Sequence, residues 1–349
     1  MLLTLILSVA SVLPSSCKKS GRVNPDTIID NSEACKILSV KKIYDAQKHC
    51  AFSDLTKFKG AWYLVFRASD NHAYTKNGTV EVLKSTDGDT WAPEVSYETP
   101  EMDLRDPKFD VNNNQLLVFT QGVKFNPDKT VKFQRGVVME AEKDPFTRSK
   151  PYTIDYDAPA YWPWRFSKLK NTSYAIGYSE TPKVLQLVKT DNFKKLTKVC
   201  DLSYIERVPS EGTVRFRDNN CYILLRRSGP TLLGVSTVND MCNFKWIELP
   251  IIGMGGPNFV FYDANTLILS GRDYPNNDYT YAGGRTSIFV YKIKENKTFR
   301  VATLPSGGDT GYPGLYLQGN RLWVSFHSAH EGTTKIYLAK AELNVSNLR

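Results

Sequence analysis

The sequence predicts an all-β protein that folds as a six-bladed β-propeller. A pattern of strand, short Asn/Gly turn and aromatic-rich strand recurs six times, with successive copies 45 to 58 residues apart. A period of about 50 residues in an all-β chain is typical of a propeller with one four-stranded blade per repeat. Aromatic residues make up 12% of the 349 residues, and long apolar segments with a helical period are few, which favours strands.

The aromatic-rich second strand is the clearest element of each repeat. The six copies are Ala61–Arg67, Gln115–Thr120, Ser173–Tyr178, Cys221–Arg227, Thr266–Arg272 and Arg321–His327. A single blade cannot bury both of its faces, so neighbouring blades must stack, and closing the ring removes the free edges. Six blades of this size use nearly the whole chain, which predicts one domain.

The fourth repeat shows how a site can arise from this pattern. Its first strand starts at Glu211, Asp218-Asn219-Asn220 reverses the chain, and the second strand ends at Arg226. A hairpin places the start of one strand beside the end of the next, so Glu211 and Arg226 should lie at the same end of the sheet. The pair is either part of a site or a structural ion pair.

The same logic applies to every blade. First strands are predicted to start near residues 49, 104, 162, 210, 256 and 311, and all of these starts should meet the ends of the second strands on one face. Charged groups are costly to place in a channel without a partner or a ligand, which predicts a site on the axis. The candidate ligand contacts are Arg67, Arg105, Asp106, Trp164, Arg165, Arg226, Arg227, Asn258, Arg272, Asp309, His327 and His330.

The N-terminus has the pattern of an export signal. Residues 1–16 are apolar and small without charge, Cys17 follows Ser15-Ser16, and Lys18-Lys19 come next. This resembles a bacterial lipoprotein signal in which Cys17 becomes the lipidated first residue, and an ordinary cleaved signal peptide is the alternative. We expect residues 18–40 to form a polar tether, residues 41–349 to form the propeller, and the protein to lie in the cell envelope or to be secreted.

Charge and cysteine content narrow the choice of partners. The net charge is +9, but no basic run exceeds two or three residues, so we expect an anionic ligand or a solvated surface rather than nucleic acid. Beyond Cys17 the chain has five cysteines, an odd number, and no CxxC motif. We expect at least one unpaired thiol, no structural zinc, no cofactor, a monomer, and membrane contact only through a lipid anchor.

Three segments carry a resemblance to a known family. They are Leu104-Arg105-Asp106-Pro107-Lys108, the run from Gly308 to Leu315, and the run from Trp323 to Gly332. The turn from Ser85 to Trp91 is similar to the Asp box of sialidase-type propellers, which is structural. The chain therefore resembles the sialidase superfamily of six-bladed propellers over roughly Ala51 to Leu343.

The resemblance implies a catalytic apparatus. Tyr312 matches the nucleophile, Glu211 matches the residue that polarises it, and Arg226 matches the second arginine of a carboxylate-binding triad. Either Arg272 or Arg285 matches the third. A neutral phenol, with a pKa of about 10, is not repelled by a substrate carboxylate, and a nearby glutamate supplies the missing basicity.

The sequence departs from the family at two places. The first triad arginine is expected at the start of blade one, where the sequence reads His49-Cys50-Ala51-Phe52, so Arg105 or Arg165 would have to replace it. The acid/base aspartate is expected shortly after Arg67, where either Asp70 or His72 could serve. Both departures count against sialic acid as the substrate.

Three functions remain open from the sequence. The leading one is an exported, surface-anchored exo-glycosidase that acts on a terminal, acidic sugar. The alternatives are a non-catalytic glycan-binding propeller and a polysaccharide lyase that uses Tyr or His as a base. Contact between Tyr312 and Glu211 favours the enzyme, and its loss favours the binder.

Overall fold

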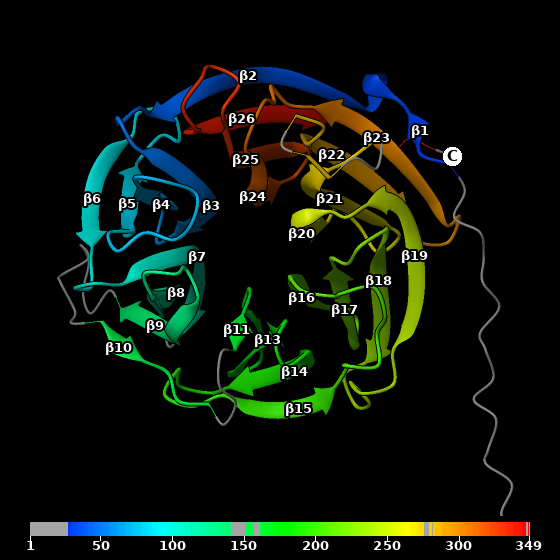
Figure 1. Cartoon of the computed structure of the whole chain (residues 1–349). Helices are drawn as coiled ribbons and strands as arrows, with labels where there is room; N and C mark the ends of the chain where they lie inside the picture. Colours follow the sequence, from blue (N-terminus) through cyan, green and yellow to red (C-terminus); the bar gives the residue numbers. More distant parts are fainter. Residues whose placement is uncertain are drawn as a thin grey trace, which may run out of the picture.

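The computed structural model describes residues 27–112, 114–140, 151–156, 161–275, 279–280, 282–346 and 348. Six antiparallel sheets surround a central axis (Figure 1), which confirms the predicted six-bladed β-propeller. The described residues contain no α-helix, and one 3-10 turn, η1 (Ser32–Ala34), precedes the outermost strand. No helix in this part of the chain is long and apolar enough to cross a membrane.

The innermost strands line the axis. They are β3 (His49–Phe58), β7 (Asp103–Asn112), β11 (Trp162–Pro163) with β12 (Ser167–Leu169), β16 (Gly212–Arg217), β20 (Gly255–Phe261) and β24 (Thr310–Gln318). The second strands are β4 (Ala61–Ser69), β8 (Gln115–Phe125), β13 (Thr172–Ser179), β17 (Asn220–Leu225), β21 (Thr266–Asp273) and β25 (Arg321–Ser328). Both sets agree with the predicted blade starts and with the six predicted aromatic-rich strands.

Two further strands complete each blade. The third strands are β5 (Thr79–Ser85), β9 (Val131–Glu140), β14 (Val184–Thr190), β18 (Pro230–Thr237), β22 (Arg285–Lys292) and β26 (Lys335–Leu343). The outer strands are β6 (Ala92–Tyr97), β10 (Tyr152–Thr153), β15 (Thr197–Asp201), β19 (Lys245–Ile252), β23 (Lys297–Thr303) and β2 (Cys35–Tyr44). The short β1 (Ile29–Asp30) adds to β23.

The ring is closed by the N-terminal part of the chain. Strand β2 pairs antiparallel with β26 from Cys35–Leu343 to Tyr44–Ile336, so the last blade takes its outer strand from the start of the propeller. Figure 1 shows β2 along the rim beside β26. This corrects the boundary of the predicted tether, because residues 29–30 and 35–40 lie in strands of blades five and six. The predicted leader, residues 1–17, lies outside the described residues.

Apolar side chains pack between each pair of neighbouring blades. Six buried clusters alternate with the six sheets, as at Val65, Leu104 and Val118 between blades one and two. A seventh, small cluster of Ala51, Phe52, Trp164 and Tyr312 lies on the axis. The axis therefore holds a packed group of aromatic side chains at the level where the site was predicted.

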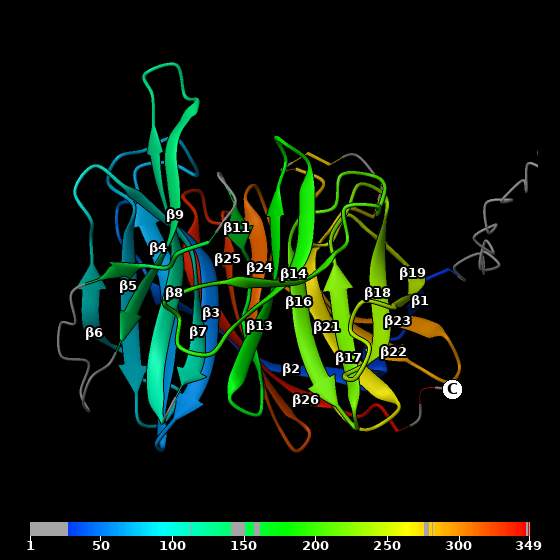
Figure 2. The same cartoon turned by 90° about the horizontal axis from the view of Figure 1, so that it is seen from below.

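The two ends of the propeller differ in shape. The hairpin of β8 and β9 projects beyond the ring on one side (Figure 2). This side carries the ends of the second strands and the starts of the first strands, so it is the face on which the predicted site residues should converge.

Candidate active site

A repeated backbone feature aims side chains at the axis. Four innermost strands change register at the same level, between Ala51 and Asp54, Arg105 and Lys108, Gly255 and Asn258, and Gly311 and Gly314. The bulged residues Phe52, Asp106, Gly256 and Tyr312 all have left-handed φ, at 62°, 51°, 60° and 53°. A bulge bends a strand and redirects its side chain. Blades one, two, five and six therefore present equivalent residues to one point on the axis.

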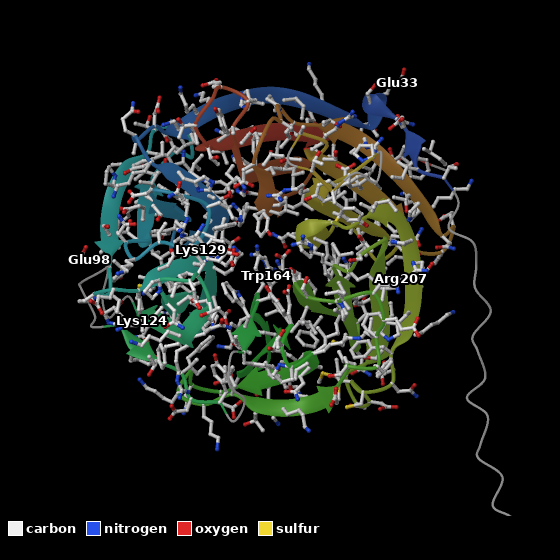
Figure 3. All side chains as sticks on the ribbon, in the orientation of Figure 1. Glu33, Glu98, Lys124, Lys129, Trp164 and Arg207 are labelled. Atoms are coloured by element: carbon white, nitrogen blue, oxygen red, sulfur yellow. The ribbon has the colours of Figure 1, made fainter. Side chains whose placement is uncertain are left out.

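Blade three supplies an aromatic residue by a different route. Its innermost strand is interrupted between β11 and β12, and Trp164 lies in this gap. Figure 3 shows the labelled Trp164 beside the centre of the ring. The Tyr312 ring lies 5.0 Å from the Phe52 ring and 5.7 Å from the Trp164 ring, centroid to centroid. Tyr312 is thus held from two sides by aromatic edges.

Tyr312 and Glu211 contact each other across the axis. The Tyr312 hydroxyl donates a hydrogen bond of 2.8 Å to Glu211 Oε1, although 101 residues separate the two. Arg226 Nη1 donates to the same Oε1 at 2.8 Å and lies 3.3 Å from the phenol oxygen. The other carboxylate oxygen accepts the Gly256 N–H at 2.7 Å. The predicted meeting of the two side chains is present in the structure.

The electrostatics keep the phenol neutral at rest. Burial, followed by the charge of Glu211, raises the pKa of Tyr312 well above its usual value, and Arg226 and Arg272 oppose the rise. The Arg272 guanidinium carbon lies 5.3 Å from the centre of the Tyr312 ring. A proton on Tyr312 therefore points at a carboxylate acceptor, with two cations placed to stabilise a developing phenolate.

Asp309 connects Arg272 with three histidines. Its Oδ1 accepts from Arg272 at 2.6 Å and lies 3.4 Å from His327 Nε2. Its Oδ2 lies 2.9 Å from His49 Nε2 and 2.5 Å from His72 Nδ1. Burial alone would raise the pKa of Asp309, but His327 and the hydrogen bonds from the histidines outweigh it and lower the pKa. Asp309 is therefore ionised.

His327 is fixed in one neutral form. The Phe52 N–H donates to His327 Nδ1 at 3.1 Å, so Nδ1 carries no proton and Nε2–H faces Asp309. Burial lowers the pKa of His327 to about 4, although Asp309 opposes the shift. His327 holds the backbone of Phe52 and the carboxylate of Asp309 in place, so we assign it as a positioning residue rather than a ligand contact.

The same cluster has the donor atoms of a metal site. The ligand atoms of His49, His72 and Asp309 all lie within 4.8 Å of one another, and two imidazoles with one carboxylate suit a divalent transition metal. Two observations oppose a cation here. Arg272 is paired with the same carboxylate. His49 Nδ1 is buried and has no hydrogen-bond partner among the described residues, whereas a metal-bound histidine normally donates its other N–H. The geometry fits a hydrogen-bonded hub better.

Arg105 lies at the mouth of the site. Its guanidinium carbon is 5.5 Å from the centres of the Phe52 and Trp162 rings, and its Nη2 donates to the His72 carbonyl at 3.4 Å. Its Nε is buried and makes no hydrogen bond within the part of the chain that the structure describes. Of the two predicted replacements for the arginine absent from blade one, Arg105 lies beside the Tyr312 cluster, whereas Arg165 contacts the Pro313 carbonyl at 3.5 Å, below the bulge level.

Asp106 is a buried carboxyl without a full set of partners. It is 7% exposed, and its Oδ1 has no hydrogen-bond partner among the described residues. Burial raises the pKa of Asp106 to about 6, the charge of Glu211 adds to the rise, and Lys108, Arg105 and Arg67 oppose it. A carboxyl of this kind can carry a proton near neutral pH, which is the requirement for a general acid.

Four of the predicted ligand contacts interact with other protein groups instead of facing the site. Arg67 is fully buried in a bidentate pair with Asp103, at 2.7 and 2.9 Å. Arg227 pairs with Glu248, away from the axis. Arg165 and Asn258 contact the Pro313 carbonyl below the bulge level, at 3.5 and 3.0 Å. This corrects their assignment as ligand contacts on the site face, because carboxylates hold Arg67 and Arg227, and Arg165 and Asn258 lie below the bulge level.

Three further predicted residues lie on the surface. Asp70 is exposed and accepts from Asn77 Nδ2 at 2.9 Å. Arg285 is exposed at the start of β22. His330 lies 3.0 Å from Ser328 Oγ and packs on the Tyr337 ring at 4.7 Å. None of the three has a described contact with Tyr312 or Glu211, so the structure favours His72 over Asp70 and Arg272 over Arg285.

The structure adds residues that the sequence did not nominate. Phe52 fills the blade-one position, His49 joins the Asp309 hub, and Tyr274 accepts a hydrogen bond from Arg272 at 3.3 Å. Tyr178 stacks on Trp162 with centroids 6.4 Å apart and planes 25° apart. One signal in the sequence could have located the bulges. In three blades the bulged residue directly precedes a proline, as in Asp106-Pro107, Gly256-Pro257 and Tyr312-Pro313.

The chain is similar to solved structures of glycoside hydrolases. The GH93 alpha-L-arabinofuranosidase of Fusarium graminearum aligns with a TM-score of 0.65 and 13% identity over 88% of this chain and 98% of that one. The intramolecular trans-sialidase from Ruminococcus gnavus gives 0.63 and 11%, over 88% and 97%. Trypanosoma rangeli sialidase gives 0.62 and 12%, over 92% of this chain and 57% of that one, so the chain spans less than two thirds of that enzyme.

These comparisons define a fold class. No family model matches the sequence, and no curated protein matches it. The structural neighbours are sialidases, a trans-sialidase and an arabinofuranosidase, all six-bladed propellers, so the predicted resemblance to sialidase-type propellers is confirmed at the level of fold. The TM-scores of 0.62 to 0.65 show that the fold is shared, at sequence identities of only 11 to 13%.

Proposed function

We propose that this protein is an exo-acting glycoside hydrolase with Tyr312 as its nucleophile. The observation that carries the proposal is the contact of Tyr312 with Glu211 and Arg226 at the axis. A tyrosine that served only in packing would not need a buried carboxylate acceptor and an arginine at its hydroxyl. The geometry also favours the enzyme over a non-catalytic glycan-binding propeller, because the contact that a binder could lose is intact.

The proposed reaction has two displacement steps. In the first, Tyr312 Oη attacks the anomeric carbon, its proton passes to Glu211, the glycosidic bond breaks, and the leaving oxygen takes a proton from a general acid. In the second, water attacks the same carbon, loses a proton to the conjugate base, and releases Tyr312, which recovers its proton from Glu211. Both steps invert the anomeric centre, so the overall result is retention.

We assign Asp106 as the general acid in place of Asp70 or His72. Asp70 is exposed on the surface, and His72 Nδ1 is engaged with Asp309. Asp106 combines burial, an oxygen without a partner and a pKa of about 6, so a large fraction is protonated at mildly acidic pH. It also projects toward the axis from a bulge equivalent to that of Tyr312.

The substrate is proposed to be a terminal sugar with an anionic group. Arg226, Arg272 and Arg105 surround Tyr312 and Phe52, and a planar guanidinium can hold a carboxylate through two hydrogen bonds. A nucleophile without charge avoids repulsion by that carboxylate. Because the start of blade one, His49 to Phe52, carries no arginine, we expect a uronic acid or another acidic sugar to fit better than sialic acid.

A panel of aryl glycosides tests this proposal. Purified protein is incubated with sialosides, uronides and neutral glycosides, alongside Tyr312→Phe and the control Tyr262→Phe, which alters a partly buried tyrosine on blade five. We expect turnover of an acidic glycoside that Tyr312→Phe abolishes and Tyr262→Phe keeps. If the protein binds glycans but turns over none of the substrates, the glycan-binding alternative is supported. An unsaturated product that absorbs in the ultraviolet would identify a lyase.

Export and anchoring are a separate proposal that rests on the sequence alone. We propose that the mature protein begins at Cys17 and is held at the cell envelope by lipid on this residue. Fractionation of host cells expressing wild type and Cys17→Ala tests it. Release of the variant from the membrane fraction is expected, and equal membrane association of the two proteins would contradict the anchor.

A further inference from the structure

The axis has a second mouth, on the face opposite the proposed active site. Past the bulge level, the innermost strands enclose a cavity of about 320 Å³ that is lined by Asp54, Arg165, Arg215, Phe261, Leu315 and Tyr316. None of these residues belongs to the cluster around Tyr312, Glu211 and Asp309. The cavity therefore requires its own explanation.

Positive charge exceeds negative charge around this cavity. Arg165 Nη1 pairs with Asp54 Oδ1 at 2.7 Å, and both side chains are 4% exposed. Arg215 has only neutral acceptors among its described hydrogen bonds: the Phe259 carbonyl at 3.1 Å, Ser167 Oγ at 3.2 Å and Asn258 Oδ1 at 3.1 Å. Of the described residues that line the cavity, one carboxylate, Asp54, therefore faces two guanidinium groups. A second carboxylate, Asp110, acts on Arg215 from outside the lining, where Ser173 Oγ at 2.7 Å and the Val111 N–H at 2.8 Å hold it.

A third cation lies just above this pair. Lys108 is 1% exposed, and its Nζ donates to the carbonyls of Phe52 and Pro107 at 3.3 and 3.1 Å. Burial lowers the pKa of Lys108 to about 8 and that of Arg215 to about 10, and in both cases the charge of Arg165 lowers it further. Buried charge of one sign is costly unless a counter-charge accompanies it.

One donor at the cavity has no partner. Arg165 Nε is buried and makes no hydrogen bond among the described residues, although the other two nitrogens of the same guanidinium do. A guanidinium of this kind binds anions through its planar edge. The unused donor of Arg165, the Arg215 guanidinium with only neutral acceptors among its described hydrogen bonds, and the open volume occur together on one side of the channel.

We propose that the second mouth of the channel is a binding site for a small inorganic anion, held between Arg165 and Arg215. The cavity is large enough for either a halide or a phosphate ion, and both present the negative charge that the two guanidinium groups lack. The proposal is independent of the glycosidase assignment, because it rests on residues of the opposite face.

The anion site is connected to the backbone of the proposed nucleophile. The Pro313 carbonyl, next to Tyr312, accepts from Arg165 Nη2 at 3.5 Å and from Asn258 Nδ2 at 3.0 Å. Asn258 in turn accepts from Arg215. An anion that neutralises Arg165 and Arg215 therefore stabilises the layer of side chains on which the Tyr312 bulge lies, and it should bind the folded state alone.

Thermal unfolding at constant ionic strength tests the proposal. Wild type, Arg215→Met and Arg217→Gln are compared in sodium gluconate and after replacement of gluconate by chloride, bromide or phosphate. Arg217 lies two residues along the same strand and pairs with the exposed Asp218 at 3.2 Å, so it is a matched control. We expect a halide or phosphate to raise the Tm of wild type and Arg217→Gln by a few degrees and to leave Arg215→Met unchanged.

The comparison of anions also separates the possible occupants. Stabilisation by chloride and bromide but not phosphate identifies a halide site, and the reverse identifies an oxyanion site. Equal Tm values in all salts, or equal shifts in wild type and Arg215→Met, would overturn the proposal. If Arg215→Met does not fold, wild-type crystals soaked in bromide and in phosphate decide: a bromide anomalous peak or phosphate density between Arg165 and Arg215 supports the site, and the absence of both there rejects it.

Discussion

Phe52 is a single residue that shapes the candidate site through both its ring and its backbone. It occupies the bulge position of blade one, and its ring packs 5.0 Å from Tyr312 and 5.1 Å from His72. Its N–H also fixes the neutral form of His327. In the proposed enzyme, Arg105 rather than a residue of blade one would supply the cation on this side of Tyr312, which would set where an anionic group of a substrate binds.

Asp106 gives a prediction that combines activity and stability. In Asp106→Asn we expect kcat/KM to fall by about 10²- to 10⁴-fold for glycosides with poor leaving groups, because the general acid is lost. Substrates with good leaving groups, such as nitrophenol, should be affected much less in the first step. Asp70→Asn should leave this dependence on the leaving group unchanged.

The pH dependence of stability has a defined sign. The pKa of Asp106 is raised from 3.8 to about 6, so between these values the unfolded chain is ionised while the folded protein keeps the proton. Stability should therefore fall as pH rises through this window, by roughly 3 kcal/mol at 1.36 kcal/mol per unit. Denaturant unfolding at pH 4 and pH 7 should show this loss in wild type and not in Asp106→Asn. An identical pH dependence in both proteins would contradict the assigned burial.

At the scale of elements, the bulges in four innermost strands position the residues that point to the axis. A regular strand would send alternate side chains to the two faces of each blade, whereas a bulge with left-handed φ aims one residue per blade along the axis. Glycine serves at this position in blade five because Tyr312 approaches closely. A Cβ on Gly256 would lie 2.5 Å from Tyr312 Cγ and 2.6 Å from Tyr312 Cα.

Two glycines with the same backbone angle separate strain from contact. Gly256 and Gly319 both have φ of 60°, but a Cβ on Gly319 meets nothing within 4 Å. Gly319→Ala should cost only the strain of a left-handed alanine, about 1–2 kcal/mol. Gly256→Ala should add a clash that displaces Tyr312 and should lose most activity. Unfolding curves and kcat/KM for both variants provide the measurement, and equal behaviour of the two would argue against close packing at Tyr312.

At the scale of the whole molecule, the ring depends on its N-terminal strand. Strand β2 covers the edge of β26, and Ala34 and Cys35 are buried in the core between blades five and six. A chain that starts at residue 47 should leave an exposed edge and unfold at a much lower temperature, with aggregation. A chain that starts at residue 27 should keep the Tm of the full chain. Equal thermal stability of the two truncated chains would refute the role of β2 in closure.

The sequence predicted the architecture well because the repeat can be read directly from the order of residues along the chain. Aromatic-rich strands and Asn/Gly turns recur at one period, so blade starts were placed within two residues of the observed ones. The outer strand β2 was missed because its pairing with β26 joins segments far apart in the chain, and nothing local in Cys35–Tyr44 signals that contact.

The site was predicted in part, for a physical reason. Tyr312, Glu211, Arg226 and Arg272 lie at strand starts and ends that a propeller must bring together. Arg67 and Arg227 also lie at the ends of second strands, but Asp103 and Glu248 hold them, and alternation along a strand does not reveal a partner on another element. The sequence nominated Asp106 as a ligand contact and not as the general acid, because its burial and raised pKa become visible only in three dimensions.

The measurement that tests the central claim most directly is a double-mutant cycle on Tyr312 and Glu211. The values of kcat/KM for wild type, Tyr312→Phe, Glu211→Gln and the double variant are determined with the aryl glycoside that proves active. Because the phenol and its proton acceptor act as one unit, each single variant should lose most activity and the double variant should be little worse than either. Losses that multiply in the double variant, or full activity in Tyr312→Phe, would contradict the assignment of Tyr312 as the nucleophile.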